Sequence, residues 1–341
     1  ARIPKGVLLE GPPGTGKTTA LARIVSEYIL KGKRVLMLSY SNVSVDGALL
    51  KVAGSLEYEE GNIIRYGYPR LPELLDNRTL TSYGYVLHKN PELEREYKAL
   101  QEEKKRLKRK DARRAELTKR MNEIRKKLSD EEKRLIQNAA FVATTVSKAV
   151  VDSAVYAQRF DAVVFDEASM AYIPQIVFAA SLAKEHFCCL GDFKQLPAIV
   201  QSPENPHLSK DIFEYTGILE AVENGYGHDW LVMLNVQYRM HPTIASFVSH
   251  YMYEDLLVSA EAIYGHKQKI ADCLPIKKEP MAMVDLSGTY SVCTKTMDGS
   301  RINLLSAMVC VRIAELLAGE YEIGIITPYS AQSRLILAML R

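Results

Sequence analysis

The sequence has few cysteines, and their spacing does not suggest a metal site. Its five cysteines are Cys188, Cys189, Cys273, Cys293 and Cys310, and none forms a C-x-x-C pair. We therefore expect no zinc site or metal cluster built on them. Cys188 and Cys189 lie in an apolar run and are predicted to be core residues. This cysteine usage is typical of a reducing, intracellular compartment, cytoplasmic or nuclear.

Long hydrophobic segments are also missing. No apolar run approaches the roughly 18 residues that a membrane-spanning helix needs, and no secretory signal peptide precedes the first predicted strand. We therefore expect no membrane partner. Because the chain starts with Ala1 and enters a predicted core strand almost at once, we expect it to be a fragment. Other domains of a longer polypeptide would then be among its partners.

The net charge is only +3, but the basic residues are concentrated in one segment. Residues 92–137 contain 17 Lys/Arg and 11 Asp/Glu, so the rest of the chain is slightly acidic. Apolar residues recur there at helical spacing in two series, with a break near 108–112, which predicts an antiparallel helical hairpin. The series are Leu93, Tyr97, Leu100 and Leu107, then Leu117, Met121, Ile124, Leu128 and Leu135. The hairpin is either a solvated structure without a partner or a basic arm near a phosphate backbone, with Arg106, Lys108, Arg109 and Lys110 guiding a strand.

The remaining sequence has the pattern of an α/β fold. Short apolar runs at 7–9, 35–38, 141–144, 162–165 and 187–190 are separated by helical patterns, which predicts a parallel sheet covered by helices on both faces. We assign 1–55 and 138–234 to a first domain, 56–137 to an inserted and mostly helical subdomain, and 235–341 to part of a second α/β domain. In that last part we expect strands at 281–285 and 323–327 and helices at 304–317 and 333–340.

The most specific motif is a phosphate-binding loop that directly follows the first predicted strand. GPPGTGKT fits the pattern G-x-x-x-x-G-K-[ST] between a strand and a helix. Its glycines let successive N–H groups face an anion, and the helix that starts near Lys17 points its positive end at the same phosphates. Lys17 would reach the β- and γ-phosphates, and the Thr18 hydroxyl would bind Mg²⁺. The predicted nucleotide-binding residues are Gly11, Pro12, Pro13, Gly14, Thr15, Gly16, Lys17, Thr18 and Thr19.

Polar residues follow two other predicted strands where those strands end. Asp166 and Glu167 follow the apolar run 163–165, and Gln195 lies in the loop after Leu190. The carboxyl ends of parallel strands face the nucleotide crevice. In phosphate-loop enzymes the first acid holds Mg²⁺ and the second activates the attacking water. Gln195 is placed to contact the γ-phosphate or that water.

Seven motifs together indicate a family. They occur in this order: GPPGTGKT, SYSNVSVD at 39–46, ATT at 143–145, VVFDEAS at 163–169, CLGDFKQLP at 189–197, VQYRMHP at 236–242 and IITPYSAQ at 325–332. The chain resembles superfamily 1 helicases, in particular the 5′-to-3′ branch that includes the RNA helicase of nonsense-mediated decay, the immunoglobulin-mu-binding proteins and the replication helicase–nucleases. The resemblance covers nearly the whole chain except the charged hairpin.

The resemblance implies a RecA-like phosphate-loop NTPase with ATP and Mg²⁺ as cofactors. It implies that Thr18 and Asp166 hold the metal, that Arg239 acts as an arginine finger and that Tyr238 stacks on the adenine. It also implies a monomeric motor that moves along single-stranded DNA or RNA. The family's N-terminal glutamine motif, its last two motifs and its β-barrel insertion are not seen, so we expect this chain to bind ATP but to hydrolyse it weakly.

Four further residues are implied as contacts to the backbone of the single strand. These are Ser41, Asn42, Thr144 and Thr145, whose hydroxyl and amide groups bind phosphate and sugar without reading sequence. For Ser41 and Asn42 a second interpretation stays open, because both residues also suit the start of a helix as caps.

Four functions remain in view at this point. The first is an ATP-dependent helicase or translocase, and the second a nucleic-acid-stimulated ATPase that remodels protein–nucleic-acid complexes without unwinding. A ring-forming ATPase of the AAA+ type fits the phosphate loop but not GDFKQLP or QYRMHP. An inactive binding module would require that the truncation be natural.

Overall fold

The computed structural model describes residues 5–108, 111–200, 202, 204–224, 227–272, 278–319 and 321–341. Cys273, Arg109 and Lys110 lie outside the described residues. The chain forms two compact units, Ala1–Asn235 and Val236–Arg341, and each is described by itself. In the described part of the chain, every helix is too short or too polar to span a bilayer.

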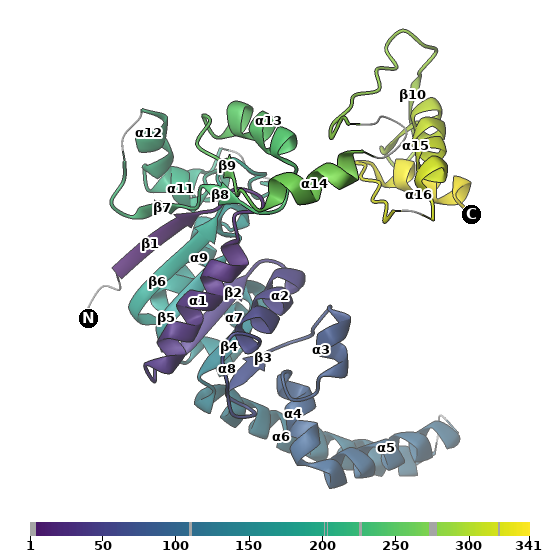
Figure 1. Ribbon diagram of the computed structural model, residues 1–341. Coiled ribbons are helices and arrows are strands. Elements are labelled where there is room, and N and C mark those ends of the chain that lie inside the picture. The colour runs from purple at the N-terminus through teal and green to yellow at the C-terminus, as the bar shows by residue number, and fades with distance from the viewer. Residues whose placement is uncertain are drawn as a thin grey trace. The chain divides into compact units, whose positions relative to one another are not determined.

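The first unit is built on one sheet of seven parallel strands (Figure 1), in the order β3-β4-β2-β5-β6-β1-β7. The strands are β1 (Lys5–Glu10), β2 (Val35–Ser39), β3 (Ile63–Arg65), β4 (Phe141–Thr145), β5 (Phe160–Asp166), β6 (Ala183–Gly191) and β7 (Leu231–Met233). The five apolar runs identified in the sequence all lie in these strands. The predicted α/β fold with a parallel sheet is therefore confirmed.

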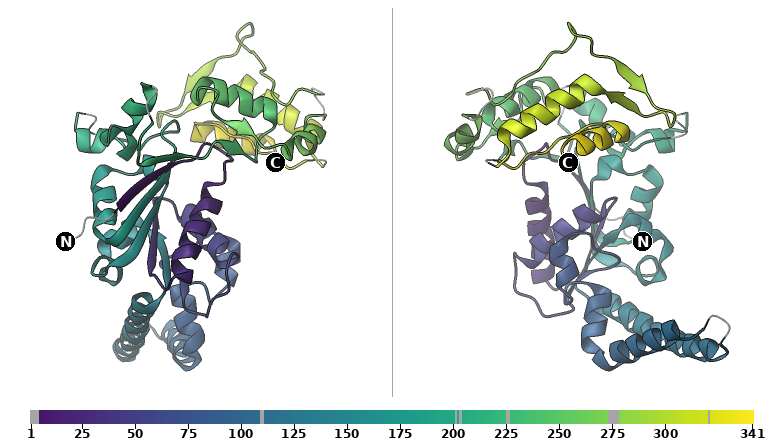
Figure 2. Two further views of the ribbon diagram at one scale, coloured as in Figure 1. Left: turned by 60° about the vertical axis from the view of Figure 1, so that its left-hand side comes forward. Right: turned by 90° about the vertical axis from the view of Figure 1, so that its right-hand side faces the viewer.

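Helices cover both faces of this sheet, as Figures 1 and 2 show. Along β2, Val35 and Met37 pack with α1 (Lys17–Leu30) and α2 (Asn42–Ala53), whereas Leu36 and Leu38 pack with the helices of the opposite face. This alternation explains why the strand is apolar throughout, since successive side chains enter different cores. The opposite face carries α7 (Val146–Val151), α8 (Ser153–Tyr156), α9 (Ile173–Ser181), α11 (Ile212–Tyr215) and α12 (Ile218–Glu223).

The charged segment forms the predicted antiparallel helical hairpin. Its helices are α5 (Pro91–Arg106) and α6 (Arg113–Asn138), and α4 (Ser82–Lys89) packs against both. Met121, Ile124 and Leu128 are buried along the predicted apolar seam of α6. Ion pairs join the two helices, with Arg120–Glu96 at 2.6 Å and Arg113–Glu103 at 2.7 Å. Part of the charge is therefore neutralised within the hairpin.

The sequence analysis missed two strands of the sheet, β3 and β7, which have three residues each. β3 lies in the segment assigned to the inserted subdomain, yet it pairs in parallel with β4 at the edge of the main sheet. It contains only three residues, too few for a periodicity to be recognised. The remaining elements of the first unit are α3 (Pro72–Asp76), the 3₁₀ helix η1 (Ala168–Met170) and α10 (Pro206–Ser209).

The second unit has eight described elements: β8 (Val236–Gln237), α13 (Pro242–Met252), β9 (Val258–Ser259), α14 (Ile263–Ala271), β10 (Cys293–Lys295), β11 (Arg301–Asn303), α15 (Leu304–Leu317) and α16 (Ser330–Met339). β8 pairs in parallel with β9, and β10 pairs antiparallel with β11. The predicted helix at 304–317 coincides with α15. The helix predicted at 333–340 begins three residues earlier, at Ser330.

The two strands predicted at 281–285 and 323–327 are wrong. Both segments are irregular in the structure, and Met283 and Ile326 are 90% and 98% exposed. A strand needs neighbours that accept and donate its backbone hydrogen bonds. Among the described residues of this unit, no neighbouring strand pairs with either segment, so an apolar pattern alone was not sufficient.

Candidate nucleotide and nucleic-acid sites

The phosphate loop connects β1 to α1 and has the backbone that its glycines allow. Gly14 and Gly16 adopt φ angles of 82° and 84°, in the left-handed region that favours glycine. The Thr15 hydroxyl donates to the Pro12 carbonyl oxygen at 2.7 Å, and the Gly11 N–H donates to the Gly191 carbonyl oxygen on β6 at 2.9 Å. These bonds curl the loop over the N-terminus of α1, as anion binding requires.

Lys17 lies inside this loop. Its Nζ donates to the carbonyl oxygen of Gly11. A Cβ atom on Gly11 would come within 2.2 Å of the Lys17 Cγ, so glycine is needed for the lysine to follow this path. Thr18 and Thr19 are exposed in the first turn of α1. The loop thus presents an ammonium group and two hydroxyls at the positive end of a helix.

Asp166 ends β5 and is almost completely buried, with 5% of its surface exposed. Burial raises the pKa of Asp166 to about 7, and the Glu167 carboxylate adds to the rise, whereas the Lys17 ammonium opposes it. The structure therefore brings Asp166 and Lys17 within electrostatic range of each other. The Asp166 carboxylate and the Thr18 hydroxyl would together supply an all-oxygen ligand set, which fits Mg²⁺.

Glu167 and Gln195 lie at the same edge of the sheet. Glu167 has a φ of 56°, which is uncommon for a residue with a side chain. β6 lies between β1 and β5, and its end carries the buried Asp192. Gln195 is exposed, and its Nε2 donates to the Asp192 Oδ2 at 2.6 Å. Asp192 therefore holds the glutamine in the loop that follows β6.

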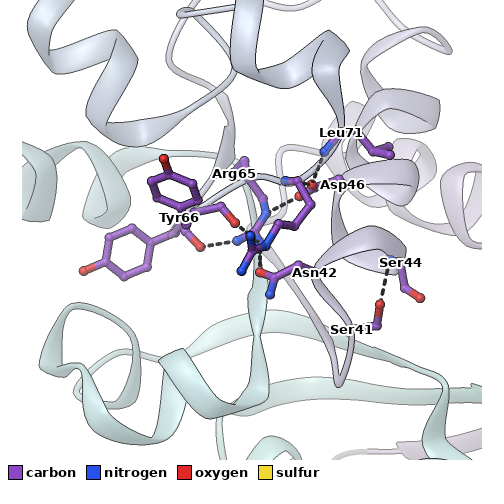
Figure 3. A network of polar contacts seen from close by, with 9 residues as sticks. Ser41, Asn42, Ser44, Asp46, Arg65, Tyr66 and Leu71 are labelled. Carbon is purple, nitrogen blue, oxygen red and sulfur yellow. Dashed lines mark hydrogen bonds and ion pairs between the residues drawn. The ribbon is translucent and has the colours of Figure 1, made fainter. Parts of the chain in front are cut away.

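The predicted nucleic-acid residues lie at the ends of β2 and β4, which pair so that Ser39 stands opposite Thr145. Ser41 caps α2, because its hydroxyl accepts the Ser44 N–H at 3.4 Å. Asn42 does not cap the helix; its Oδ1 accepts a hydrogen bond from Arg65 at 2.7 Å (Figure 3). The capping interpretation therefore describes Ser41 but not Asn42.

Thr144 and Thr145 differ in their surroundings. Thr145 caps α7 and accepts the Lys148 N–H at 3.3 Å. Thr144 is fully buried, and its Oγ1 has no hydrogen-bond partner among the described residues. Such a hydroxyl costs stability unless something else satisfies it. The structure thus leaves Thr145 half-buried at the strand end and Thr144 below the surface.

Sequence reasoning missed the buried ion pair that underlies Asn42. The Arg65 Nε donates to the Asp46 Oδ1 at 2.6 Å, and both side chains are buried, with 1% and 0% exposed (Figure 3). Burial lowers the pKa of Arg65, and the Asp46 carboxylate opposes that shift. Asp46 belongs to motif SYSNVSVD, so its aspartate was visible, but nothing in the sequence identified Arg65 as its partner.

Tyr238 and Arg239 lie in the second unit, both exposed, on the turn between β8 and α13. The side chain of Gln237 is fully buried and organises this turn. Its amide oxygen, Oε1, accepts hydrogen bonds from the N–H groups of Arg239 and Met240, each at 2.8 Å. Its Nε2 donates to the Met240 carbonyl oxygen and to the Ser259 hydroxyl. All four hydrogen bonds of the amide are used, which fixes the turn that presents Tyr238 and Arg239. Sequence reasoning named the motif but missed this role of its glutamine.

Comparison with known proteins gives two family matches. A family model described as an AAA domain matches residues 3–203, and a second model with the same description matches residues 217–341. Together they include both units of the structure.

Among curated proteins, the chain is 30% identical to DNA polymerase alpha-associated DNA helicase A of Schizosaccharomyces pombe, over 98% of this chain and 51% of that protein. It is 26% identical to Regulator of nonsense transcripts 1 of Dictyostelium discoideum, over 95% of this chain and 24% of that protein. It is 26% identical to DNA-binding protein SMUBP-2 of Mus musculus, over 96% of this chain and 34% of that protein.

The chain thus spans about half the length, or less, of these relatives. The AAA-domain match over 3–203 covers more than half of the chain, and the relatives extend along nearly all of it. The resemblance drawn from the seven motifs is confirmed: the chain belongs to the superfamily 1 helicase family.

Proposed function

We propose that this chain is the core of an ATP-driven nucleic-acid motor, a helicase or translocase. The observation that carries the proposal is the phosphate loop with Lys17 in electrostatic range of the buried Asp166. The names of two relatives support the same function. One is a DNA helicase, and the other is a regulator of nonsense transcripts, which are nucleic acids. We propose that it acts inside the cell, in the cytoplasm or the nucleus.

Each side chain of the ATP site has a role in this proposal. Lys17 moves its hydrogen bond from the Gly11 carbonyl oxygen to the β- and γ-phosphate oxygens, while the loop N–H groups hold the remaining oxygens. Thr18 and Asp166 hold Mg²⁺, which neutralises charge on the phosphates when bound. Glu167 takes the proton of the attacking water, and the amide of Gln195 orients that water or the γ-phosphate.

The second unit contributes two residues. Arg239 stabilises the negative charge that develops on the transferred phosphoryl group, and Tyr238 stacks on the adenine. Both side chains are exposed on the turn held by Gln237, where they are free to contact a nucleotide. ATP hydrolysis would move the protein along single-stranded DNA or RNA in the 5′-to-3′ direction, and the protein would act as a monomer.

We place the single strand along the carboxyl ends of β2 and β4. Asn42 has no partner for its Nδ2 group among the described residues, so this amide can donate to a phosphate. Ser41 and Thr145 lie at the same edge of the sheet, and Thr144 is buried directly before Thr145. The hairpin adds basic residues to this path. Lys104, Lys119 and Lys126 line one groove between its helices, and their positive charges suit the binding of a phosphate backbone.

The test is ATPase activity with and without single-stranded DNA and RNA oligonucleotides at fixed low salt. Lys17→Ala removes the cation at the phosphates and should lower stimulated turnover on the order of 100-fold or more. Lys31→Ala, an exposed lysine at the other end of α1, is the matched control and should leave turnover unchanged. Turnover that survives Lys17→Ala would contradict the proposed site.

A strand-displacement assay then separates the two motor functions. Unwinding of a duplex with a 5′ overhang supports the helicase, and stimulated ATP hydrolysis without unwinding supports a remodelling ATPase. A hexamer on size-exclusion chromatography would instead indicate a ring-forming ATPase.

A further inference from the structure

The loop that follows β3 exposes one aromatic ring between buried neighbours. Tyr68 is 75% exposed, whereas Tyr66 is 4% exposed and Pro69 is buried. Gly67 makes this possible with a φ of 100°, and a Cβ there would lie 3.3 Å from the Arg65 Nη1. The backbone thus turns tightly around the guanidinium and directs the Tyr68 ring to the surface.

The backbone of this loop is held at both ends by the buried ion pair. Arg65 donates from Nη1 to the Tyr66 carbonyl oxygen and from Nη2 to the Tyr68 carbonyl oxygen, the latter at 3.2 Å. Asp46 accepts the N–H groups of Arg70 and Leu71 (Figure 3 shows the latter). A loop with this many hydrogen bonds holds the backbone that carries the exposed ring in a defined place, which lowers the entropy lost on binding.

The same nitrogen of Arg65 also holds Asn42. Nη2 donates to the Asn42 Oδ1 at 2.7 Å and to the Tyr68 carbonyl oxygen, so the two residues are neighbours. Both lie at the carboxyl edge of the parallel sheet, where ligands of such sheets bind. The Tyr68 backbone therefore lies beside Asn42, and the exposed ring extends from it. A backbone contact and an aromatic ring are the two components of single-strand binding.

We propose that Tyr68 is a base-stacking residue of the nucleic-acid path, and that Arg65 is the positioning residue that holds the backbone of its loop next to Asn42. The inference rests on the proposed function, since it adds a contact to the same single strand. Its ligand is a nucleobase of any sequence, because stacking on an aromatic ring is sequence-tolerant. Asn42 binds the backbone, and Tyr68 binds the face of an adjacent base.

The experiment measures binding of fluorescein-labelled oligo-dT and oligo-U of about 10 nucleotides by fluorescence anisotropy over a range of salt. Tyr68→Ala should weaken binding about 5- to 150-fold, while Tyr68→Phe and Tyr68→Trp should stay within about threefold. The slope of log affinity against log salt should not change, because stacking releases no counterions. Tyr156→Ala is the matched control: this tyrosine is 45% exposed and just precedes β5, at the opposite edge of the sheet.

An oligonucleotide made entirely of abasic sites separates stacking from a structural effect. Wild type and Tyr68→Ala should bind it equally, because it has no base to stack. An equal loss on the abasic strand, or no loss on the intact one, overturns the proposal while wild-type binding upholds the proposed function. Failure of the folded wild type to bind any single strand, checked by thermal unfolding, overturns both.

Discussion

Removal of the Asp46 carboxylate is the most direct test of how the carboxyl edge of the sheet is built around Arg65. In Asp46→Ala, Arg65 loses its ion-pair partner, and the N–H groups of Arg70 and Leu71 lose their acceptor. The guanidinium cannot reach water, because its side chain is only 1% exposed. It remains charged, because an arginine side chain is not deprotonated in proteins. Its remaining partners are the neutral oxygens of Asn42, Tyr66 and Tyr68, which do not compensate the charge.

The expected cost is large for a single substitution. Breaking a buried ion pair by removing one partner destabilises a protein by about 3–5 kcal/mol, because the other charge is left uncompensated. The total stability of a folded protein is typically only about 5–15 kcal/mol. For a unit of this size the loss corresponds to a decrease in Tm of about 6–20 °C.

Urea unfolding followed by circular dichroism measures this loss, with Glu185→Ala as the control. Glu185 pairs with Lys33 at 2.7 Å, but 42% and 38% of the two side chains are exposed, so its removal should cost under about 1 kcal/mol. The double variant Asp46→Leu/Arg65→Met should recover part of the loss, since no unpaired charge remains. A cost for Asp46→Ala no greater than that for Glu185→Ala would refute this account of the network.

Three further predictions concern other polar groups that are buried or partly buried. Thr144→Val should leave the free energy of unfolding unchanged or raise it by up to about 1 kcal/mol, because it removes an unpaired hydroxyl; a clear loss in urea unfolding would mean that the hydroxyl has a partner. Gln237→Leu should speed amide hydrogen exchange at residues 239 and 240, whose N–H groups lose their acceptor, and unchanged exchange would show that the turn does not depend on this amide. Burial alone would raise the pKa of Asp152, but hydrogen bonds from Lys148 and Tyr66 outweigh it and hold the pKa at about 2. The depressed pKa contributes stability above the unfolded-state value of about 4 that is lost as pH falls toward 2. The stability difference between wild type and Asp152→Asn should therefore be largest above about pH 5 and shrink toward pH 2, and a pH-independent difference in urea midpoints would contradict this.

Much of the fold was predictable because it depends on local patterns. The phosphate loop combines fixed residue types with a strand before it and a helix after it. The five longer strands of the sheet contain continuous apolar runs. The hairpin was predictable from the heptad-like spacing of residues such as Ile124 and Leu128. These signals arise from neighbours close in sequence, and each is confirmed in the structure.

The parts that were missed depend on distant partners. Arg65 is a charged residue whose burial becomes understandable only once Asp46, 19 positions earlier, is known to lie beside it. Gln237 is buried because its amide meets Ser259 across the β8–β9 pair, a contact between two-residue strands that have no pattern. The segments 281–285 and 323–327 show the converse, since their apolar residues favour strands but find no paired neighbour among the described residues.

The point at which the hairpin joins the sheet has a consequence for how this chain can change in length. The chain leaves the sheet at β3 and returns at β4, and these strands pair directly, with Ile63 opposite Phe141. Because the two strands are parallel, the chain leaves at the carboxyl end of β3 and returns at the amino end of β4, and their pairing fixes both ends of the excursion. Closing a longer segment costs only about 0.6 kcal/mol for each doubling of its length. The segment between α5 and α6 is thus a site where sequence can be added, removed or exchanged while β3 and β4 keep their register.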